Sequence, residues 1–257
     1  MHSTAGDLGA DRPSRPPVFV AAAADLAGDR LTLRGPEGRH ASTVRRLAPG
    51  ERADLTDGAG GVAECLVAAA RPGELELTVL SRRTEPPPRP RLVILQAIPK
   101  GDRGELAVEL LTEVGADVIV PWAADRCVAV WRGERAVKAR ARWLSAAAQA
   151  AKQSRRCWFP EVTDQADLAA AAARISSAAA GIVLSPAAPD RLADLPLPAD
   201  GDIVLAVGPE GGISPREEAA LLAAGARSAR LGPTVLRASS AGLAAAAAVL
   251  SRTARWD

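Results

Sequence analysis

A run of prolines divides the chain into two parts that we expect to fold as separate domains. The segment reads Glu85-Pro86-Pro87-Pro88-Arg89-Pro90-Arg91. Proline has no backbone N–H to donate to a helix or a sheet, and consecutive prolines favour the extended polyproline II conformation. The run therefore predicts a stiff linker at residues 85–91, between a first domain at 1–84 and a second domain at 92–257.

The first part of the chain carries short segments of strand type separated by turns. The glycine-rich stretch Asp57–Gly61 lies between two of them, as the turn of a β-hairpin does, and Arg71-Pro72-Gly73 marks the next turn. Several short strands with regular turns predict a small β-barrel. The expected strands are Val18–Val20, Arg30–Arg34, Arg52–Thr56, Val62–Ala69 and Glu74–Leu80.

The second part alternates between apolar strands and helices, which predicts an α/β domain with a mostly parallel sheet. Ser214 is placed to cap one helix, with Glu217 and Glu218 in its first turn. The expected strands are Leu92–Ala97, Val118–Pro121, Ile182–Leu184, Ile203–Val207 and Ala229–Leu231, and the expected helices are Gly104–Gly115, Glu134–Gln153, Pro215–Ala224 and Ser239–Ser251.

Composition excludes several classes of protein. Of the 257 residues 48% are hydrophobic and 24% charged, which is typical of a globular chain. No run approaches about 20 apolar residues without a charge or a proline, and the first residues contain no apolar core, so we expect neither a membrane span nor a signal peptide. The three cysteines are far apart, the only histidines are His2 and His40, and no CxxC or HxxxH pair occurs. We therefore expect free thiols, no metal site and a cytoplasmic location.

The small net charge of +2 conceals a basic tract at residues 126–156. The tract holds nine cations against Glu134 alone, a net charge of +8, which leaves −6 for the rest of the chain. Arg135, Lys138 and Arg142 recur at helical spacing and share one helix face. Two of the five tryptophans, Trp131 and Trp143, also lie in the tract, and Trp158 follows it closely. An ordinary solvated helix face is one interpretation, but arginine with aromatic residues suits phosphate contacts and base stacking, so the tract favours an acidic partner.

A glycine-rich loop is the first candidate ligand site. Gly208-Pro209-Glu210-Gly211-Gly212 follows the expected strand Ile203–Val207 and precedes the capped helix. Glycines let a ligand approach the backbone closely, and α/β sheets bind ligands at the carboxyl ends of their strands. The tetrapeptide Gly35-Pro36-Glu37-Gly38 repeats the pattern in the first domain, where we expect no strand–helix context. Neither GxGxxG after a strand nor GxxxxGK[ST] occurs, so no Rossmann dinucleotide site or P-loop is predicted.

A second loop joins the last expected strand to the closing helix. It reads Leu231-Gly232-Pro233-Thr234-Val235-Leu236-Arg237-Ala238-Ser239-Ser240-Ala241, and Ser239 or Ser240 is a candidate N-cap. Alone, the loop would be an ordinary β–α connection with an outward arginine. Two Gly-Pro loops at neighbouring strand ends instead predict one concave site.

The two loops resemble the cofactor loops of the SPOUT (trefoil-knot) methyltransferases, and specifically those of the RsmE family, which methylates N3 of a uridine in small-subunit ribosomal RNA. The resemblance continues in order along nearly the whole chain. The chain departs from the family pattern at Leu110 (often lysine), Lys152 (glutamate) and Ser239-Ser240 (Glu-Thr). Matching segments are Arg15–Val20, His40 with Val44–Leu47, Gly50, Asp57-Gly58, Glu113–Asp117, Arg126-Cys127 and Ala151–Arg155.

The resemblance implies an α/β SPOUT trefoil-knot domain with a parallel sheet, preceded by a small PUA-like β-barrel that binds RNA. It also implies S-adenosylmethionine as the cofactor, held bent by backbone groups of the knotted loops. The last helix, Ser239–Leu250, would line the site and form part of a homodimer interface. The expected cofactor-binding residues are Leu184, Ser185, Gly208, Pro209, Glu210, Gly211, Gly212, Leu231, Gly232, Val235, Leu236, Ser240 and Ala241.

The implied activity is S-adenosylmethionine-dependent methylation of N3 of a uridine in 16S ribosomal RNA, with the RNA or the small ribosomal subunit as partner. Uridine N3 bears a proton and titrates roughly two units above neutral, which costs about 3 kcal/mol at neutral pH. We expect Arg237 to stabilise the deprotonated uracil, while Glu210 is either a base or a carboxylate that braces its loop. No metal is needed. The expected RNA-binding residues are Arg126, Arg132, Arg135, Lys138, Arg142, Lys152, Arg155 and Arg156.

Three alternatives stay open. A ribose 2′-O-methyltransferase would have the same fold, but those relatives usually carry an asparagine in an early motif, and this chain contains no asparagine. A non-catalytic RNA-binding assembly factor would fit the departure at Ser239-Ser240. A small-molecule methyltransferase is the alternative that the basic tract supports least.

Overall fold

The computed structural model describes residues 16–101 and 103–256, so that Arg15, where the resemblance begins, lies outside the described residues. The chain forms two compact units that meet between Glu85 and Pro86. Residues 85–90 contain neither helix nor strand. No helix in the described ranges combines the length and apolar character that a membrane crossing requires.

The first unit is a five-stranded mixed sheet in the order β1-β3-β4-β5-β2. Only β1 and β3 pair in parallel; the other neighbours are antiparallel. All five expected strands form, but β4 and β5 are longer than expected because their ladder continues through two register shifts. The strands are β1 (Val18–Val20), β2 (Arg30–Leu33), β3 (Arg52–Thr56), β4 (Gly61–Arg71) and β5 (Glu74–Thr84), with a 3-10 turn, η1 (Asp25–Ala27), before β2.

The tetrapeptide at Gly35–Gly38 has a strand–helix context after all, and our expectation there was wrong. It follows β2 and forms α1 (Gly35–Arg39), which continues into a π-helical segment, η2 (His40–Val44). Proline fits the first turn of a helix, where its missing N–H has no partner to lose. A Cβ on Gly38 would lie 2.5 Å from the carbonyl oxygen of Gly73, so this glycine is required for packing.

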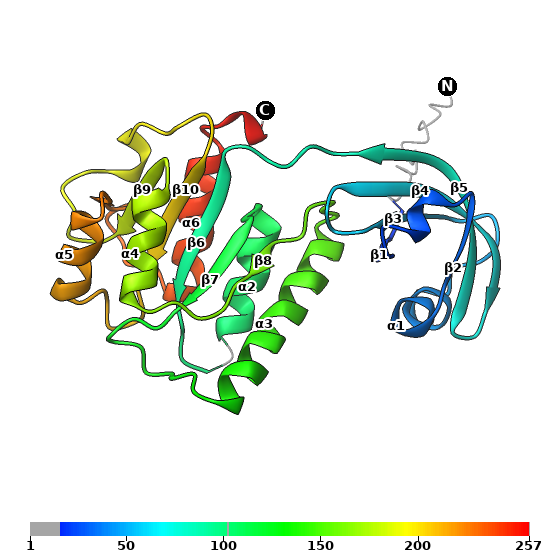
Figure 1. Cartoon of the computed structure of the whole chain (residues 1–257), viewed down its shortest axis with the longest axis horizontal. Coiled ribbons are helices and arrows are strands. Elements are labelled where there is room, and N and C mark those ends of the chain that lie inside the picture. The colour runs from blue at the N-terminus through cyan, green and yellow to red at the C-terminus, as the bar shows by residue number, and fades with distance from the viewer. Residues whose placement is uncertain (1–15, 102, 257) are drawn as a thin grey trace, which may run out of the picture. The chain divides into compact units, whose positions relative to one another are not determined.

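The second unit is a six-stranded, wholly parallel sheet in the order β11-β9-β10-β6-β7-β8 (Figure 1). This confirms the predicted α/β fold. The strands expected at 92, 118, 182 and 203 all form. The strand expected at Ala229–Leu231 lies two residues earlier than expected, and the short β8 was not expected. The strands are β6 (Arg91–Ala97), β7 (Val118–Trp122), β8 (Glu161–Val162), β9 (Ala180–Leu184), β10 (Asp202–Val207) and β11 (Arg227–Ala229).

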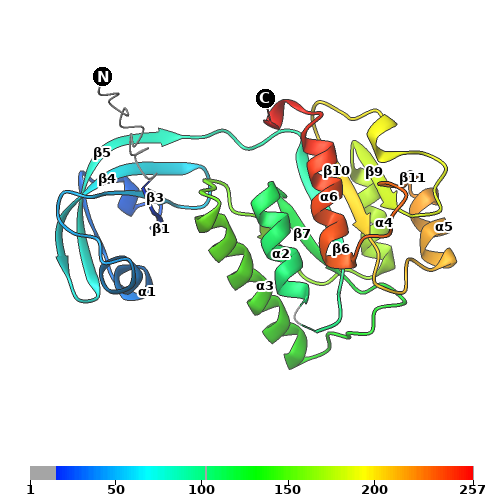
Figure 2. The same ribbon diagram turned by 180° about the vertical axis from the view of Figure 1, so that it is seen from behind.

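Helices cover both faces of this sheet. On one face α2, α3 and α6 pack against the sheet, and on the other α4 and α5 do so (Figures 1 and 2). The three helices predicted before residue 225 form close to their expected bounds, and α4 was not expected. The helices are α2 (Arg103–Val114), α3 (Glu134–Gln153), α4 (Leu168–Ser177), α5 (Pro215–Ala223) and α6 (Ala238–Leu250), with 3-10 turns η3 (Leu192–Asp194) and η4 (Ala254–Trp256).

The closing helix α6 begins one residue earlier than expected. Its N-cap is Arg237, with no side-chain cap, so neither Ser239 nor Ser240 has the capping role we expected. Ser240 instead donates its hydroxyl to the carbonyl oxygen of Arg237 at 3.3 Å. Small residues let α6 pack closely: a Cβ on Gly242 would lie 3.0 Å from Leu111 of α2.

The two central strands β6 and β10 mark the position in the sheet where a ligand-binding crevice is expected. They are neighbours and run in parallel, yet β6 leads into α2 on one face while β10 leads into α5 on the other. The loops that follow two such strands diverge and leave a crevice at the carboxyl edge of the sheet. Every loop of the predicted site leaves this edge, because all six strands are parallel.

Candidate functional site

The predicted cofactor loops lie at one edge of the sheet. Leu184 ends β9 and Ser185 follows it, the glycine loop follows β10, and the segment 230–237 follows β11. The backbone of Ser185 donates to Ala229 at 3.0 Å, and that of Leu192 donates to Arg230 at 2.9 Å. The loop after β9 is therefore joined to the segment that leads into α6.

The glycine loop Gly208–Gly212 is shaped by close contacts. A Cβ on Gly208 would lie 2.7 Å from the side chain of Ile213, and Gly212 has a φ of +74°, which an L side chain rarely adopts. The N–H of Gly212 donates to the carbonyl oxygen of Pro209 at 2.8 Å and closes the turn. Pro209 is buried, whereas Glu210, Gly211 and Gly212 are exposed. The loop therefore presents backbone to solvent.

The predicted N-cap of α5, Ser214, is confirmed, and it forms a capping box with Glu217. Ser214 accepts from the backbone of Glu217 at 3.2 Å, and the Glu217 carboxylate accepts from the backbone of Ser214 at 2.9 Å. The other oxygen of Glu217 accepts from the backbone of Asp125 at 2.7 Å, in the loop after β7. Glu217 is only 1% exposed, so its carboxylate fixes two loops to each other.

Asp125 completes this connection. Its carboxylate accepts from the Ser214 hydroxyl at 2.8 Å and from the guanidinium of Arg216 at 2.7 Å. These two donors, Arg216 first, hold the pKa of Asp125 below its usual range. Sequence analysis missed Asp125 because its partners are about ninety residues away along the chain.

Arg126, an expected RNA ligand, lies directly against the glycine loop. Its guanidinium donates to the carbonyl oxygen of Gly211 at 2.9 Å. A Cβ on Gly211 would lie 3.2 Å from the Cβ of Arg126, so the two backbones approach closely. The beginning of the basic tract is thus part of the same site as the predicted cofactor loop.

The loop before α6 leaves main-chain donors without partners. Among the residues that the structure describes, the N–H groups of Leu231, Gly232, Val235 and Leu236 donate no hydrogen bond. A Cβ on Gly232 would meet nothing within 4 Å. Ser240 and Ala241 lie in the first turn of α6 and are half-buried. Backbone donors beside open space are suited to a ligand that carries acceptor atoms.

Gln96 is a buried polar residue that sequence analysis did not single out. It is the last residue but one of β6, lies opposite Val207 of β10 in the sheet, and is fully buried. Its amide nitrogen donates to the carbonyl oxygens of Ala97 at 3.0 Å and of Ala238 at 3.4 Å, which joins β6 to the start of α6. Its side-chain oxygen has no partner among the described residues. Buried polar atoms are rarely left unpaired outside functional sites.

The two candidate catalytic residues differ in their surroundings. The guanidinium of Arg237 is exposed and makes no hydrogen bond or ion pair within the described residues. Glu210 accepts from the backbone of Lys100 at 3.4 Å and lies 3.8 Å from the guanidinium of Arg103. Glu210 is therefore engaged with the loop that follows β6.

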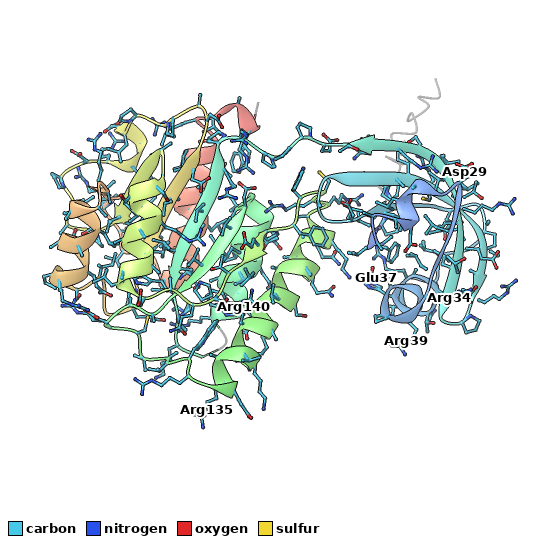
Figure 3. The ribbon with its side chains drawn as sticks, viewed as in Figure 1. Asp29, Arg34, Glu37, Arg39, Arg135 and Arg140 are labelled. Carbon is cyan, nitrogen blue, oxygen red and sulfur yellow. The ribbon has the colours of Figure 1, made fainter. Side chains whose placement is uncertain are left out.

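The other cations of the tract divide into two groups. Arg132, Arg135, Lys138 and Arg142 are exposed, and Arg135 projects from the start of α3 (Figure 3). Arg142 pairs with Glu105 at 2.7 Å. The second group contacts the protein itself. Arg156 pairs with Asp117 at 3.3 Å, and Arg140 donates to the carbonyl oxygens of Val162 and Thr163. Lys152 is buried, and Arg155 is exposed with its backbone in a left-handed conformation. No group of His, Cys, Asp and Glu in the described part of the chain is arranged to hold a metal ion.

Comparison with known proteins shows which protein domains the two units resemble. Residues 85–250 match the family model of an RNA methyltransferase domain, and residues 33–80 match that of an RNA methyltransferase PUA domain. The ribosomal RNA small subunit methyltransferase E of Mycobacterium tuberculosis is 47% identical over 234 residues, which cover 90% of this chain and 89% of the relative.

Two crystal structures extend the comparison. The ribosomal RNA small subunit methyltransferase E of Neisseria gonorrhoeae, bound to S-adenosyl methionine, superposes with a TM-score of 0.81 and 28% identity over 92% of this chain and 97% of that one. A methyltransferase of Legionella pneumophila, in complex with the same cofactor, superposes with a TM-score of 0.84 and 25% identity over 93% of this chain and 99% of that one. The domain matches and the close mycobacterial relative together show that the chain belongs to the RNA methyltransferase family.

Proposed function

We propose that this protein transfers a methyl group from S-adenosylmethionine to N3 of a uridine in 16S ribosomal RNA of the small ribosomal subunit. The observation that carries the proposal is that two loops leave the same edge of the parallel sheet: the glycine loop after β10 and the loop after β11, whose main-chain donors are unpaired among the described residues. The relatives named for small-subunit ribosomal RNA methylation, two of which cover about nine-tenths of the chain, support this assignment.

The residues around the crevice fit S-adenosylmethionine. Adenine and ribose carry acceptor atoms, and the free N–H groups of Leu231, Gly232, Val235 and Leu236 can donate to them. The space beside Gly232 and the exposed backbone of Gly208–Gly212 provide room for the cofactor. Leu184 and Ser185 at the end of β9, Pro209 in the glycine loop, and Ser240 and Ala241 in the first turn of α6 would complete the cofactor site. When bound, the cofactor supplies a methyl group on a sulfonium, which is already activated for transfer.

Replacement of Gly232 tests this cofactor site without disturbing the fold. A side chain at Gly232 meets no protein atom within 4 Å and its φ is not left-handed, so we expect Gly232→Val to unfold at the wild-type temperature. The added methyl groups would occupy the cofactor's place and raise its Kd by about tenfold or more. Isothermal titration calorimetry with S-adenosylmethionine measures the Kd. Gly232→Ala should give a smaller increase, and an unchanged Kd for the valine variant would contradict the site.

The chain's own residues must make the uridine nitrogen reactive. Deprotonated uracil carries negative charge on its two carbonyl oxygens, and an adjacent guanidinium stabilises that anion. Arg237 is exposed, precedes α6 and has no competing partner in the described residues, so we assign it this role. Glu210 is engaged with Lys100 and Arg103, which supports a bracing role more than that of a base.

The exposed cations of α3 form the proposed RNA-binding face. Arg132, Arg135 and Lys138 make no ion pair in the described part of the chain, so their charge is available to phosphates. Arg126 would contact RNA beside the glycine loop. Lys152, Arg155 and Arg156 engage the protein itself, and the PUA-like unit would provide a second RNA contact.

The salt dependence of RNA binding tests this face. Each phosphate contact that is lost makes the slope of log K against log salt about one unit less negative. We expect the double variant Arg135→Ala, Lys138→Ala to flatten the slope by about two units, measured by filter binding of small ribosomal subunits. Arg142→Ala is the matched comparison and should change the slope less, because Glu105 already neutralises that cation. Equal slopes for the double variant and the wild type would exclude this face.

We also propose that the chain is knotted, forms a homodimer and is located in the cytoplasm. The loop after β9 bonds to both ends of the last segment: Leu192 donates to Arg230, and Arg252 donates to Leu192 and Leu195 at 3.0 and 2.6 Å. This supports a knotted passage of residues 230–252 beside that loop. We propose a dimer through α6, and a monomer by sedimentation equilibrium would exclude it.

The proposed function itself is tested in cells. Nucleosides of small-subunit ribosomal RNA from a deletion strain should lack 3-methyluridine when analysed by mass spectrometry, and complementation with this chain should restore it. Persistence of the modified nucleoside would exclude the activity. An assembly factor without catalysis would be recognised by the absence of cofactor binding in calorimetry, and a ribose 2′-O-methyltransferase by loss of a 2′-O-methylated nucleoside instead.

A further inference from the structure

A second cationic loop lies across the crevice from the glycine loop, outside the basic tract. It joins β6 to α2 and carries Lys100, and Arg103 follows as the first residue of α2. Because β6 and β10 are neighbours, this loop and Gly208–Gly212 leave the same edge of the sheet side by side. Lys100 and Arg103 are both exposed. The loop therefore places two cations at the entrance to the crevice.

Glu210 connects the two sides of the crevice. Its Oε1 accepts from the backbone N–H of Lys100 at 3.4 Å and lies 3.8 Å from Nη1 of Arg103. The bond to Lys100 uses its backbone and leaves its ammonium group free to bind elsewhere. Within the described residues the side chain of Lys100 forms no ion pair. Glu210 thus contacts the loop through the backbone of Lys100, and the ammonium group of Lys100 is exposed.

The opposite edge of the sheet shows that this charge is not a general feature of an arginine-rich protein. Near the amino ends of the strands three guanidinium groups pair with carboxylates, with N–O distances of 2.5–2.9 Å. The carboxyl edge, in contrast, carries cations that have no carboxylate partner among the described residues. Unbalanced positive charge beside a crevice attracts polyanions. The paired arginines are Arg89 with Asp200, Arg91 with Asp202, and Arg255 with Asp117, whereas Lys100, Arg126 and Arg237 lack a carboxylate partner among the described residues.

We propose that Lys100 and Arg103 bind the phosphate groups that flank the target nucleotide. This rests on the proposed function. If a target base enters between the loops after β6 and β10, the sugar-phosphate backbone on either side of that base must pass over the ends of these two loops. Lys100 and Arg103 lie at one of those tips, and Arg126 lies at the other side against Gly211. The β6–α2 loop is then a substrate-binding element for a phosphodiester, separate from the helical face of α3.

Single substitutions test the proposal on RNA binding and on catalysis separately. We expect Lys100→Ala to weaken the binding of small ribosomal subunits about five- to tenfold in filter binding and to flatten the salt slope by about one unit. Arg103→Ala should have a smaller effect in the same direction, because Glu210 lies 3.8 Å from its guanidinium. In methyl-transfer assays KM for the subunit should rise by the same factor with kcat within twofold, because a phosphate contact binds ground and transition states alike. Lys100→Arg should restore most of the affinity, since it retains the charge. The Kd of S-adenosylmethionine should be unchanged.

The control is Arg89→Ala, which removes an exposed cation from the opposite edge, where Asp200 neutralises it. It should bind subunits like the wild type. Wild-type affinity and slope for both Lys100→Ala and Arg103→Ala would overturn the proposal, as would a weakened Kd for the cofactor, which would place the loop in the cofactor site. If the wild type binds subunits without methylating uridine and the variants still lose affinity, phosphate binding stands and the proposed activity fails.

Discussion

Arg237→Ala is expected to lower kcat for RNA methylation by about 10²- to 10³-fold while leaving the Kd of S-adenosylmethionine unchanged. The loss of one preorganised group that stabilises developing charge has an effect of this size. The guanidinium of Arg237 has no partner in the described residues, so its removal breaks no internal contact. Its backbone, which accepts the first bonds of α6 from Ser240 and Ala241, is unaffected by the substitution.

The pH dependence of this variant separates anion stabilisation from a structural role. Without the guanidinium, reaction requires uridine that has lost its proton unaided, so kcat should rise about tenfold per pH unit up to about two units above neutral. The deficit relative to the wild type should therefore shrink as the pH rises. Arg237→Lys should recover part of the rate because it retains a charge. A deficit that is constant with pH, or near-normal turnover in Arg237→Ala, would show that this residue does not stabilise the uracil anion.

The sequence predicted the sheet well because its central strands are buried on both faces. Leu92–Leu95 and Ile203–Val207 are continuous apolar runs, and such runs that end close to a glycine or proline identify parallel strands without help from packing. The helix α4 (Leu168–Ser177) was missed because five of its ten residues are alanine, and alanine is so frequent throughout this chain that the segment did not stand out. The local sequence pattern therefore predicted most strands and helices, and it failed for a helix whose composition resembles that of the whole chain.

The parts of the site that could not be predicted depend on pairs far apart in the chain. The position of Glu217 in a capping box was predictable, but its bond to Asp125 depends on the order of β7 and β10 in the sheet. From the sequence, Glu210 could be either a base or a carboxylate that braces its loop. Its contacts with Lys100 and Arg103, which favour the second role, depend on the neighbouring strand β6. Charge counting also treated every cation of the tract as available, although Arg156 is held inside the protein. Net charge therefore locates an RNA-binding region but does not select its residues.

Asp117→Ala is expected to destabilise the second unit by about 3 to 5 kcal/mol, the largest stability effect of any single substitution considered for this chain. The Asp117 carboxylate is 9% exposed and pairs with two nearly buried arginines, Arg156 at 3.3 Å and Arg255 at 2.5 Å. It also accepts from the backbone of Leu92 at 2.8 Å, at the start of β6. Burial lowers the pKa of Arg156 and Asp117 opposes that shift, so removal of the carboxylate leaves two buried cations without a counter-charge.

Urea unfolding followed by tryptophan fluorescence measures this effect on the second unit alone, because all five tryptophans lie beyond residue 120. Asp200→Ala is the matched control: it also removes an aspartate paired with an arginine at 2.9 Å, but that aspartate is 71% exposed. A surface pair contributes about 1 kcal/mol or less, so the control should unfold almost like the wild type. Asp117→Asn should fall between the two, because it retains an acceptor for Leu92 while losing the charge. If Asp117→Ala is no less stable than Asp200→Ala, the arginines at this edge do not depend on Asp117, and the cluster of three charges does not hold β6, the end of α2 and the C-terminal turn together.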